Sequence, residues 1–158
     1  SAYTARIARE KSLQDELNAQ VAAWYRKARD YRLAEEKRQE DATIANRQLP
    51  PPGLTDEALE AQALQAARNR ARQQGWEETI TGAYFTDMDW TIIRNRNTGI
   101  QLRREINGVI TMKRKDGRCS YHLASFAQQY DGNDYRVVTV SGIVPGQLIL
   151  SCDEIPFP

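Results

Sequence analysis

A cysteine–histidine pair is the first chemistry to consider, because a thiolate beside an imidazole makes a nucleophile with its base. The chain of 158 residues holds two cysteines, Cys119 and Cys152, and a single histidine, His122. Cys119 and His122 are three residues apart, so on a strand they face opposite sides, whereas Cys152 with His122 stays geometrically open. The alternatives are a Cys119–Cys152 disulfide or two buried free cysteines, in each case beside an ordinary histidine. Since a structural zinc ion needs four ligands, we expect no metal site.

Carboxylates are a second candidate, because neighbouring carboxylates catalyse proton transfer or bind a cation. Asp87 and Asp89 lie just before a tryptophan, and the segment 131–134 (Asp-Gly-Asn-Asp) has the composition of a calcium loop. Both segments also fit turns between strands, and the second lacks the downstream glutamate of a calcium loop. The chain has neither a glycine-rich phosphate loop nor a nucleophile elbow. We therefore expect a protein without catalytic activity or cofactor, and an enzyme that uses Asp87 or Asp89 is the alternative.

The chain is nearly neutral, with 22 Lys and Arg against 21 Asp and Glu, so it lacks the overall positive charge of a general nucleic-acid binder. One segment is locally basic and holds only Glu105 and Asp116 as acids. Its cations, called the basic group below, are Arg94, Arg96, Arg103, Arg104, Lys113, Arg114, Lys115 and Arg118. They would bind an anionic lipid or polymer, or alternatively they keep exposed hairpins from pairing with other chains. No Phe or Tyr is interleaved with them, so we expect no nucleic-acid partner.

The front of the chain is predicted to be one long helix. Residues 2–48 contain neither Gly nor Pro and are rich in Ala, Arg, Glu, Gln and Leu, which favour helix. Five residues follow the 4, 3, 4, 3 spacing of a coiled coil, and together they form what is called the seam below. The seam consists of Leu17, Val21, Trp24, Ala28 and Tyr31. A continuous helix over 4–46 would be about 65 Å long, and we expect it to bind a protein partner or a second copy through the seam. The alternative is that it folds back onto its own domain.

A run of three prolines marks the clearest boundary in the chain. Residues 50–53 (Pro-Pro-Pro-Gly) cannot continue a helix and favour an extended spacer. After them, residues 55–57 (Thr-Asp-Glu) are typical of a helix start and Gly75 of a helix end. The sequence therefore predicts a helical segment over 1–49, a linker over 50–54 and a sheet domain over 55–158 whose helix covers 55–74.

From residue 76 the pattern changes to short strands separated by turns. Asn107-Gly108, Asp116-Gly117, Asp131-Gly132 and Pro145-Gly146 favour turns. The expected strands cover 79–85, 90–95, 99–106, 109–115, 118–129, 135–141 and 147–152. The fold class is therefore α+β, with a long N-terminal helix and then one helix packed on an antiparallel sheet. Cystatin-like and NTF2-like proteins have arrangements of this kind, an architectural analogy that no motif in the chain narrows to a family.

The expected turns also fix which residues pair across the sheet. A two-residue loop at Asp116-Gly117 would pair Met112 with Tyr121 and Ile110 with Leu123, and would bury these four side chains on one face. A hairpin at Asn107-Gly108 would then place the apolar residues of the preceding strand on the opposite face.

The disulfide conflicts with a plain meander of these strands. Cys152 would end the next-but-one strand from Cys119, and the two Cα atoms would lie at opposite ends of the sheet, beyond the ~7 Å limit for a bridge. We therefore expect the disulfide to form and the meander to be interrupted, with residues 122–130 as a short helix or an irregular crossover.

The cysteines and the start of the chain bear on the compartment. A start at Ser1 without Met suits a mature exported protein, for instance a lipoprotein whose lipid-bearing cysteine preceded Ser1, and trimming of the chain is the alternative. No apolar run approaches the ~20 residues that span a bilayer. We expect a non-catalytic interaction protein of the cell envelope, periplasmic or associated with the outer membrane, with a cytoplasmic location as the alternative. The second hypothesis is a ligand-binding module that recognises an anion through the basic group or holds a ligand between its sheet and its helix.

Overall fold

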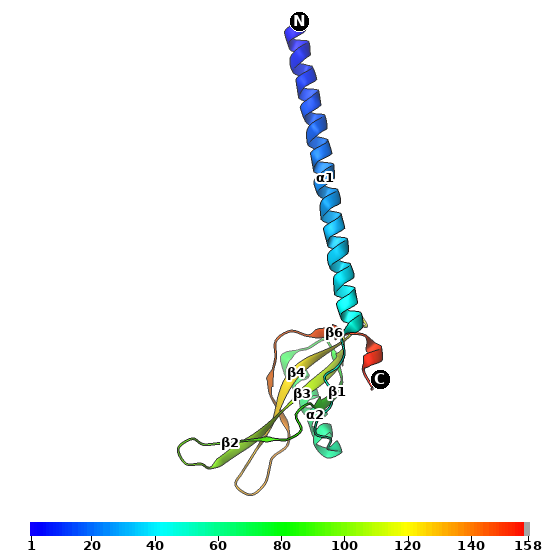
Figure 1. The fold of residues 1–158 in the computed structure, drawn as a ribbon. Coiled ribbons are helices and arrows are strands. Elements are labelled where there is room, and N and C mark those ends of the chain that lie inside the picture. The colour runs from blue at the N-terminus through cyan, green and yellow to red at the C-terminus, as the bar shows by residue number, and fades with distance from the viewer. Residues whose placement is uncertain (157–158) are drawn as a thin grey trace. The chain divides into compact units, whose positions relative to one another are not determined.

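The structure is a computed structural model that describes residues 1–156. Its contacts divide the chain into two compact units, one formed by residues 1–43 and the other beginning at residue 44. Figure 1 traces the helices and strands of both units. The predicted α+β class is confirmed, because a long N-terminal helix is followed by a second helix and an antiparallel sheet of six strands.

The first unit consists of helix α1 (Ala2–Asn46) up to residue 43. Its residues include neither Gly nor Pro, and Pro50 follows shortly after its end. A single helix has no packed neighbour within its own unit, and none of the α1 side chains is buried. Its helical state therefore depends on residue propensity and on ion pairs along the helix, and not on a core. In the described part of the chain, no helix has an apolar stretch long enough to cross a membrane.

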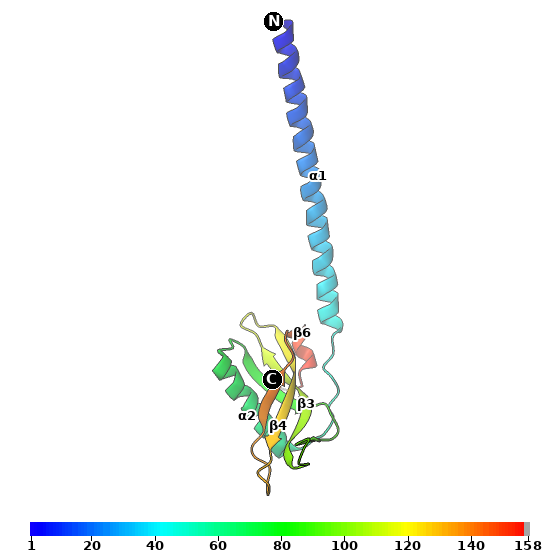
Figure 2. The same cartoon turned by 90° about the vertical axis from the view of Figure 1, so that its left-hand side faces the viewer.

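Helix α2 (Glu57–Gln74) ends where predicted and begins two residues after the predicted start at residue 55. The Asp56 side chain accepts a hydrogen bond of 3.1 Å from the Leu59 N–H, which caps the first turn. Gly75 ends the helix in the left-handed conformation, with φ +67°. The buried face of α2 consists of alanines, namely Ala63, Ala67 and Ala71. Because these side chains are short, α2 lies close against one face of the sheet (Figure 2).

The sheet has one main path and two short additions. Its strands are β1 (Thr79–Phe85), β2 (Thr91–Arg94), β3 (Gln101–Lys113), β4 (Cys119–Gln129), β5 (Thr139–Ile143) and β6 (Leu148–Leu150). The order is β1-β3-β4-β5, while β2 pairs with β3 and β6 pairs with β4. The short helix η1 (Cys152–Glu154) follows β6. The main core, which includes Phe85, Ile110 and Phe126, lies between the sheet and α2.

The hairpin predicted at Asn107-Gly108 is wrong. Both residues lie inside the continuous strand β3, where Asn107 pairs with Ser125 and Gly108 pairs with Ala124. The glycine is needed there for close packing and not for a turn. A Cβ on Gly108 would lie 2.3 Å from the Tyr84 carbonyl oxygen and 2.8 Å from the Phe126 ring. The Asn-Gly pair therefore marks a place where β1 and an aromatic ring approach the backbone of β3.

The turn at Asp116-Gly117 is present, but the predicted register is wrong. The loop covers residues 114–118, with Arg114 N donating to Arg118 O at 2.8 Å, so Met112 pairs with Ser120 and Ile110 with His122. This differs by one residue from a two-residue loop. Because a one-residue shift reverses the facing of a strand, Tyr121 lies on the face opposite to the main core.

The predicted conflict between the disulfide and the meander does not arise, and the predicted helix or crossover at 122–130 is wrong. Strand β4 continues to Gln129, and both β5 and β6 run antiparallel along it. Residues 145–146 (Pro-Gly) interrupt the pairing with β4 but do not reverse the direction of the chain. Leu150 therefore pairs with Cys119. The Cα atoms of Cys119 and Cys152 are then 5.1 Å apart, and the predicted disulfide is confirmed.

A smaller core covers the other face of the sheet. It contains Val109, Cys119, Tyr121 and Leu150, against which Leu49, Tyr84, Leu148 and Ile155 pack. The proline-rich segment is bonded to the end of β1, with Gly53 N donating to Phe85 O and Leu54 N donating to Asp87 O, both at 2.8 Å. A Cβ on Gly53 would lie 2.3 Å from the Asp87 carbonyl oxygen, so the close approach requires glycine. The division of the chain at this segment into linker and domain stays a prediction.

The stability of the second unit at alkaline pH is expected to depend on Tyr84. Its hydroxyl donates a 2.6 Å hydrogen bond to the Pro50 carbonyl, and burial, with the neighbouring Tyr121, raises the pKa of the phenol from 10.0 to about 12. The folded state therefore holds this proton more tightly than the unfolded chain does. The contribution of Tyr84 to stability is complete below pH 10.0 and is lost as the pH rises to about 12.

Replacement of Tyr84 by Phe tests this dependence. We expect Tyr84→Phe to lower the free energy of unfolding by about 1 kcal/mol at neutral pH, because the hydrogen bond to Pro50 is lost. Above pH 10.0 the variant should lose stability less steeply than the unsubstituted chain. Urea unfolding at several alkaline pH values, followed by tryptophan fluorescence, measures both effects. Parallel pH profiles for the two chains would contradict the assignment.

Candidate functional site

The seam of α1 presents its apolar side chains without cover from a core. The exposed fractions are 53% for Leu17, 45% for Val21, 65% for Trp24 and 73% for Tyr31. Their spacing places them along one side of the helix, where a coiled-coil partner would insert its own side chains. Tyr25 lies beside the seam, with its ring 5.2 Å from that of Trp24 in an edge-to-face contact. A continuous apolar stripe of this kind can bind another helix, whereas exposed apolar residues scattered singly are ordinary on protein surfaces.

Charged side chains on α1 pair mainly with one another along the helix. Arg6 Nε lies 3.0 Å from Glu10, and Arg32 Nε lies 3.8 Å from Glu36, both one turn apart. All of these side chains are more than half exposed, so each pair contributes only a few tenths of a kcal/mol. These pairs help to keep α1 helical, and they leave the seam unoccupied.

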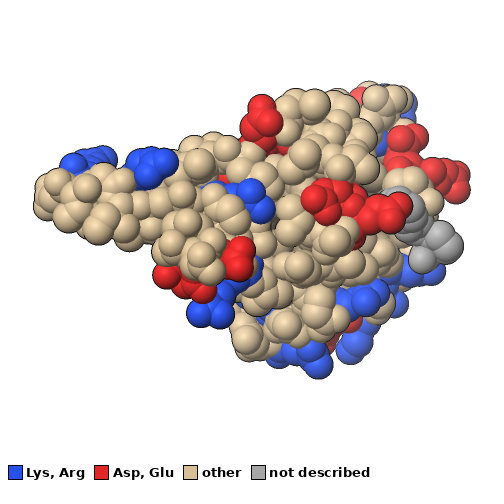
Figure 3. Space-filling view, turned by 90° about the horizontal axis from the view of Figure 1, so that it is seen from below, with Lys and Arg blue, Asp and Glu red and all other residues tan. Residues whose placement is uncertain are grey.

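The structure does not bring the basic group together. Its members lie at two different ends of the sheet, and Figure 3 shows cationic and anionic side chains interspersed on the face that it presents. Arg103 Nε donates to Glu105 at 2.8 Å, and Lys115 lies 3.5 Å from Glu77. Arg94 donates to the Gly99 carbonyl at 3.3 Å. Binding of an anionic lipid or polymer by this group stays a prediction.

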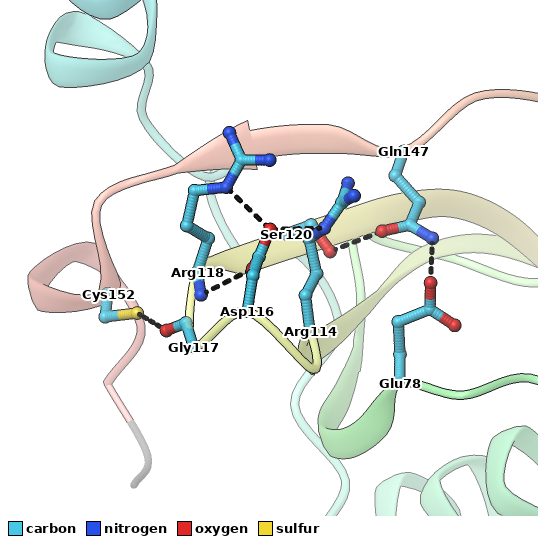
Figure 4. A network of polar contacts seen from close by, with 8 residues as sticks. All are labelled: Glu78, Arg114, Asp116, Gly117, Arg118, Ser120, Gln147 and Cys152. Carbon is cyan, nitrogen blue, oxygen red and sulfur yellow. Dashed lines mark hydrogen bonds and ion pairs between the residues drawn. The ribbon is translucent and has the colours of Figure 1, made fainter.

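In the hairpin between β3 and β4, one carboxylate is shared by two more members of the basic group. Asp116 accepts hydrogen bonds of 3.0 Å from both N–H and Nε of Arg118, and its carboxylate lies 3.6 Å from Arg114 (Figure 4). These bonds, the Arg118 N–H first among them, lower the pKa of Asp116. The side chains at this hairpin tip thus hold the loop in shape.

Arg104 has a structural role that its neighbours in sequence do not reveal. Its guanidinium lies 4.4 Å from the centre of the Trp90 ring and 3.9 Å from that of Tyr135. It also donates two hydrogen bonds, of 2.9 and 2.6 Å, to Gln128 Oε1. Residues 103 and 104 are consecutive on β3, so their side chains point to opposite faces and cannot serve one ligand. Arg104 thereby ties the loops at this end of the sheet together.

No family model, curated protein or solved structure matches this chain. A functional assignment therefore depends on the chemistry and geometry of its own residues.

A polar network that the sequence does not indicate closes the other end of the sheet. Ser120 is fully buried and donates to Gln147 Oε1 at 2.8 Å, and Gln147 Nε2 donates to Glu78 at 2.6 Å (Figure 4). The bond from Gln147 is the main reason that the pKa of Glu78 is lowered. The network connects segments 69 residues apart, so no local motif could have pointed to it. It anchors the chain between β5 and β6.

Substitution of Gln147 by Leu tests the anchor. The Ser120 hydroxyl would stay buried without a partner, and we expect the free energy of unfolding to fall by about 1–3 kcal/mol. The lowered pKa of Glu78 contributes stability above its usual value of 4.5, and this contribution is lost as the pH falls. Urea unfolding of Gln147→Leu at neutral and acidic pH should therefore show a smaller loss in acid than the unsubstituted chain shows. An equal loss would indicate that Glu78 does not depend on Gln147.

The candidate catalytic side chains occupy structural positions. Cys119 is bonded to Cys152, and the Cys152 sulfur lies 3.7 Å from the Gly117 carbonyl. His122 is buried against Trp76, with ring centres 5.3 Å apart, and its Nδ1 lies 3.3 Å from the Val144 carbonyl. These contacts give the cysteines and the histidine a place in the packing of the sheet.

The two aspartates of the acid–base hypothesis have different surroundings. Asp87 Oδ2 accepts a 3.0 Å hydrogen bond from the Asn107 N–H, and its own carbonyl accepts from Leu54 N. Asp89 is exposed. At the predicted calcium-like segment, Asp131 Oδ1 accepts from the N–H groups of Asn133 and Asp134, which is the hydrogen bonding of a hairpin turn.

The space between α2 and the sheet is filled by side chains of the main core. A groove of about 210 Å³ lies at its edge, between α2 and β5. Amide side chains line it, and one of them, Gln62, accepts a 3.0 Å hydrogen bond from the Val138 N–H. This contact pairs the backbone N–H just before β5, a group that would otherwise be open to another chain.

Proposed function

We propose that this chain is a non-catalytic interaction protein of the cell envelope, periplasmic or associated with the outer membrane. In this proposal α1 binds a protein partner through its seam. The second unit, which begins at residue 44 and is called the α+β unit below, acts as a rigid body. The observation that carries the proposal is the exposed apolar stripe of Leu17, Val21, Trp24, Ala28 and Tyr31 on a helix whose remaining side chains are mostly charged or small. Burial of such a stripe by a second helix is the usual way in which it is stabilised.

The α+β unit supports the second part of the proposal. The Cys119–Cys152 disulfide, the Ser120–Gln147–Glu78 network and the Arg104 contacts each tie sheet ends to loops. These contacts restrict the motion of the loops relative to the sheet.

The envelope location rests on the disulfide, because such bonds persist mainly in oxidising compartments. The test is to block free thiols in intact source cells before the protein is extracted. We expect both cysteines to escape blocking and the intact mass to increase by two hydrogens after reduction. Two blocked thiols would place the protein in a reducing compartment.

The interaction itself can be tested by the size of the native assembly in extracts of the source cells. We expect the full chain to migrate as part of a larger complex, and Val21→Glu with Trp24→Glu to release it as a free chain. The matched control is Ala22→Glu with Ala23→Glu, which adds the same charges beside the seam positions but outside the seam. A free unsubstituted chain, or release by both pairs of substitutions, would contradict the proposal.

A further inference from the structure

The charged residues on either side of the seam are all positive. If Val21 and Ala28 are the a positions of a heptad and Leu17, Trp24 and Tyr31 are the d positions, the flanking e and g positions are fixed. From residue 11 to residue 34 they are occupied by Lys11, Leu13, Asn18, Gln20, Tyr25, Lys27, Arg32 and Ala34. Three of these are cations and none is an acid. The acids of the same stretch, Asp15, Glu16 and Asp30, lie at the outward b and c positions.

These flanking cations are available to a partner. Among residues 1–156, no carboxylate lies within ion-pair distance of Lys11 or Lys27. Arg32 has only the 3.8 Å contact with Glu36, and its side chain is 69% exposed. A helix that docks in the seam would therefore meet positive charge along both of its sides.

A second copy of this chain fits the seam poorly in either direction. In a parallel pair the g position meets the following e position of the partner, which places Lys27 against Arg32 of the second copy. In an antiparallel pair with Val21 opposite Trp24, Lys11 faces Arg32 of the second copy. The parallel pair brings these cations together on both sides of the interface and the antiparallel pair on one side, and like charges at these positions are unfavourable.

We propose that the seam binds an α-helix of a different protein that carries acidic residues beside its own apolar stripe. This inference rests on the proposed function and adds the chemistry of the partner. The seam also restricts the size of the partner's side chains, because the large Trp24 is followed by the small Ala28. A parallel partner helix would have a small residue opposite Trp24 and a large apolar residue opposite Ala28, so that side chains fill the interface.

The test uses two synthetic helical peptides as probes. Both have the same apolar residues at a and d, while e and g are Glu in one peptide and Lys in the other. Binding of each labelled peptide to the full chain is measured by fluorescence anisotropy. We expect the Glu peptide to bind about tenfold more tightly at low salt, because contacts with Lys11, Lys27 and Arg32 change from attractive to repulsive between the two peptides. The difference should nearly vanish at about 1 M salt, where charges are screened within about 3 Å.

Charge reversal on α1 provides the matched variants. Lys27→Glu with Arg32→Glu should reverse the preference, so that the Lys peptide binds more tightly. The control is Arg26→Glu with Arg29→Glu, which makes the same change in net charge on the outward f and b positions. The control should keep the preference for the Glu peptide.

The outcomes separate this inference from the proposed function. Equal binding of both peptides, abolished by Trp24→Glu, would overturn the acidic partner and leave α1 as an interaction helix. Self-association of the full chain at the same concentrations, abolished by Trp24→Glu, would make the partner a second copy and would also overturn the inference. Binding of neither peptide would overturn the inference as well, while the native-assembly experiment would still decide the proposed function.

Discussion

Removal of the Cys119–Cys152 disulfide is expected to lower the free energy of unfolding of the α+β unit by about 3–4 kcal/mol. The bridge joins residues 33 positions apart, and it restricts the unfolded chain over that loop. It also fixes the end of β6 and the start of η1 beside the first residue of β4. Without it, the smaller core around Val109, Tyr121 and Leu150 keeps only its apolar contacts.

The measurement is urea unfolding of Cys119→Ser with Cys152→Ser, followed by the fluorescence of Trp76 and Trp90. Addition of a reductant to the unsubstituted chain should produce the same loss of stability, and it should leave the double variant unchanged. A loss below about 1 kcal/mol would mean that the sheet is held by its cores alone, without a contribution from the bridge.

Replacement of Phe126 by Ala is expected to destabilise the same unit by about 3–5 kcal/mol. Its side chain is fully buried, packs edge-to-face on Phe85 with ring centres 5.7 Å apart, and lies over Gly108. The substitution leaves a cavity between α2 and the sheet that the rigid strands on either side cannot fill.

Leu123 provides a control on the same strand. It lies on the opposite face of β4 and is 37% exposed, so Leu123→Ala should cost less than about 1 kcal/mol. Urea unfolding of both variants, compared under the same conditions, measures the difference. Similar losses for the two variants would show that the main core does not lie on the face to which Phe126 points.

The parts of the fold that depend on local chemistry could be predicted from the sequence. Helix α2 is bounded by its caps Asp56 and Gly75, because a capping carboxylate and a left-handed glycine act within one turn. Helix α1 and the spacing of its seam were predictable for the same reason, since a helical period is visible over a few residues. The disulfide was expected because two cysteines can form one bridge.

The parts that depend on distant neighbours could not be predicted. Asn107-Gly108 has the composition of a turn, yet β1 and Phe126 hold this position in the middle of a strand. Pro145-Gly146 also reads as a reversal, but the chain continues along β4 because Val144 N still bonds to Leu123 O. Only the pairing partner decides whether such residues reverse a strand or interrupt it.

The candidate binding surfaces also differ in whether local sequence could predict them. The cations of the basic group are close in sequence, but their side chains are distributed over two faces and two ends of the sheet, and several have acidic partners. The network of Glu78, Ser120 and Gln147 unites residues that no sequence motif connects. The seam survives as a candidate because all of its residues belong to one helix.

The contact made by the seam can be measured directly by placing a photoreactive amino acid at Val21 in the full chain, in living source cells. The same amino acid at Ala23, on the outward side of the same helical turn, is the matched control. The proposed function predicts an adduct with one other protein from position 21 and none from position 23. Adducts of equal yield from both positions, or none from position 21 in cells that contain the protein at its normal level, would contradict it.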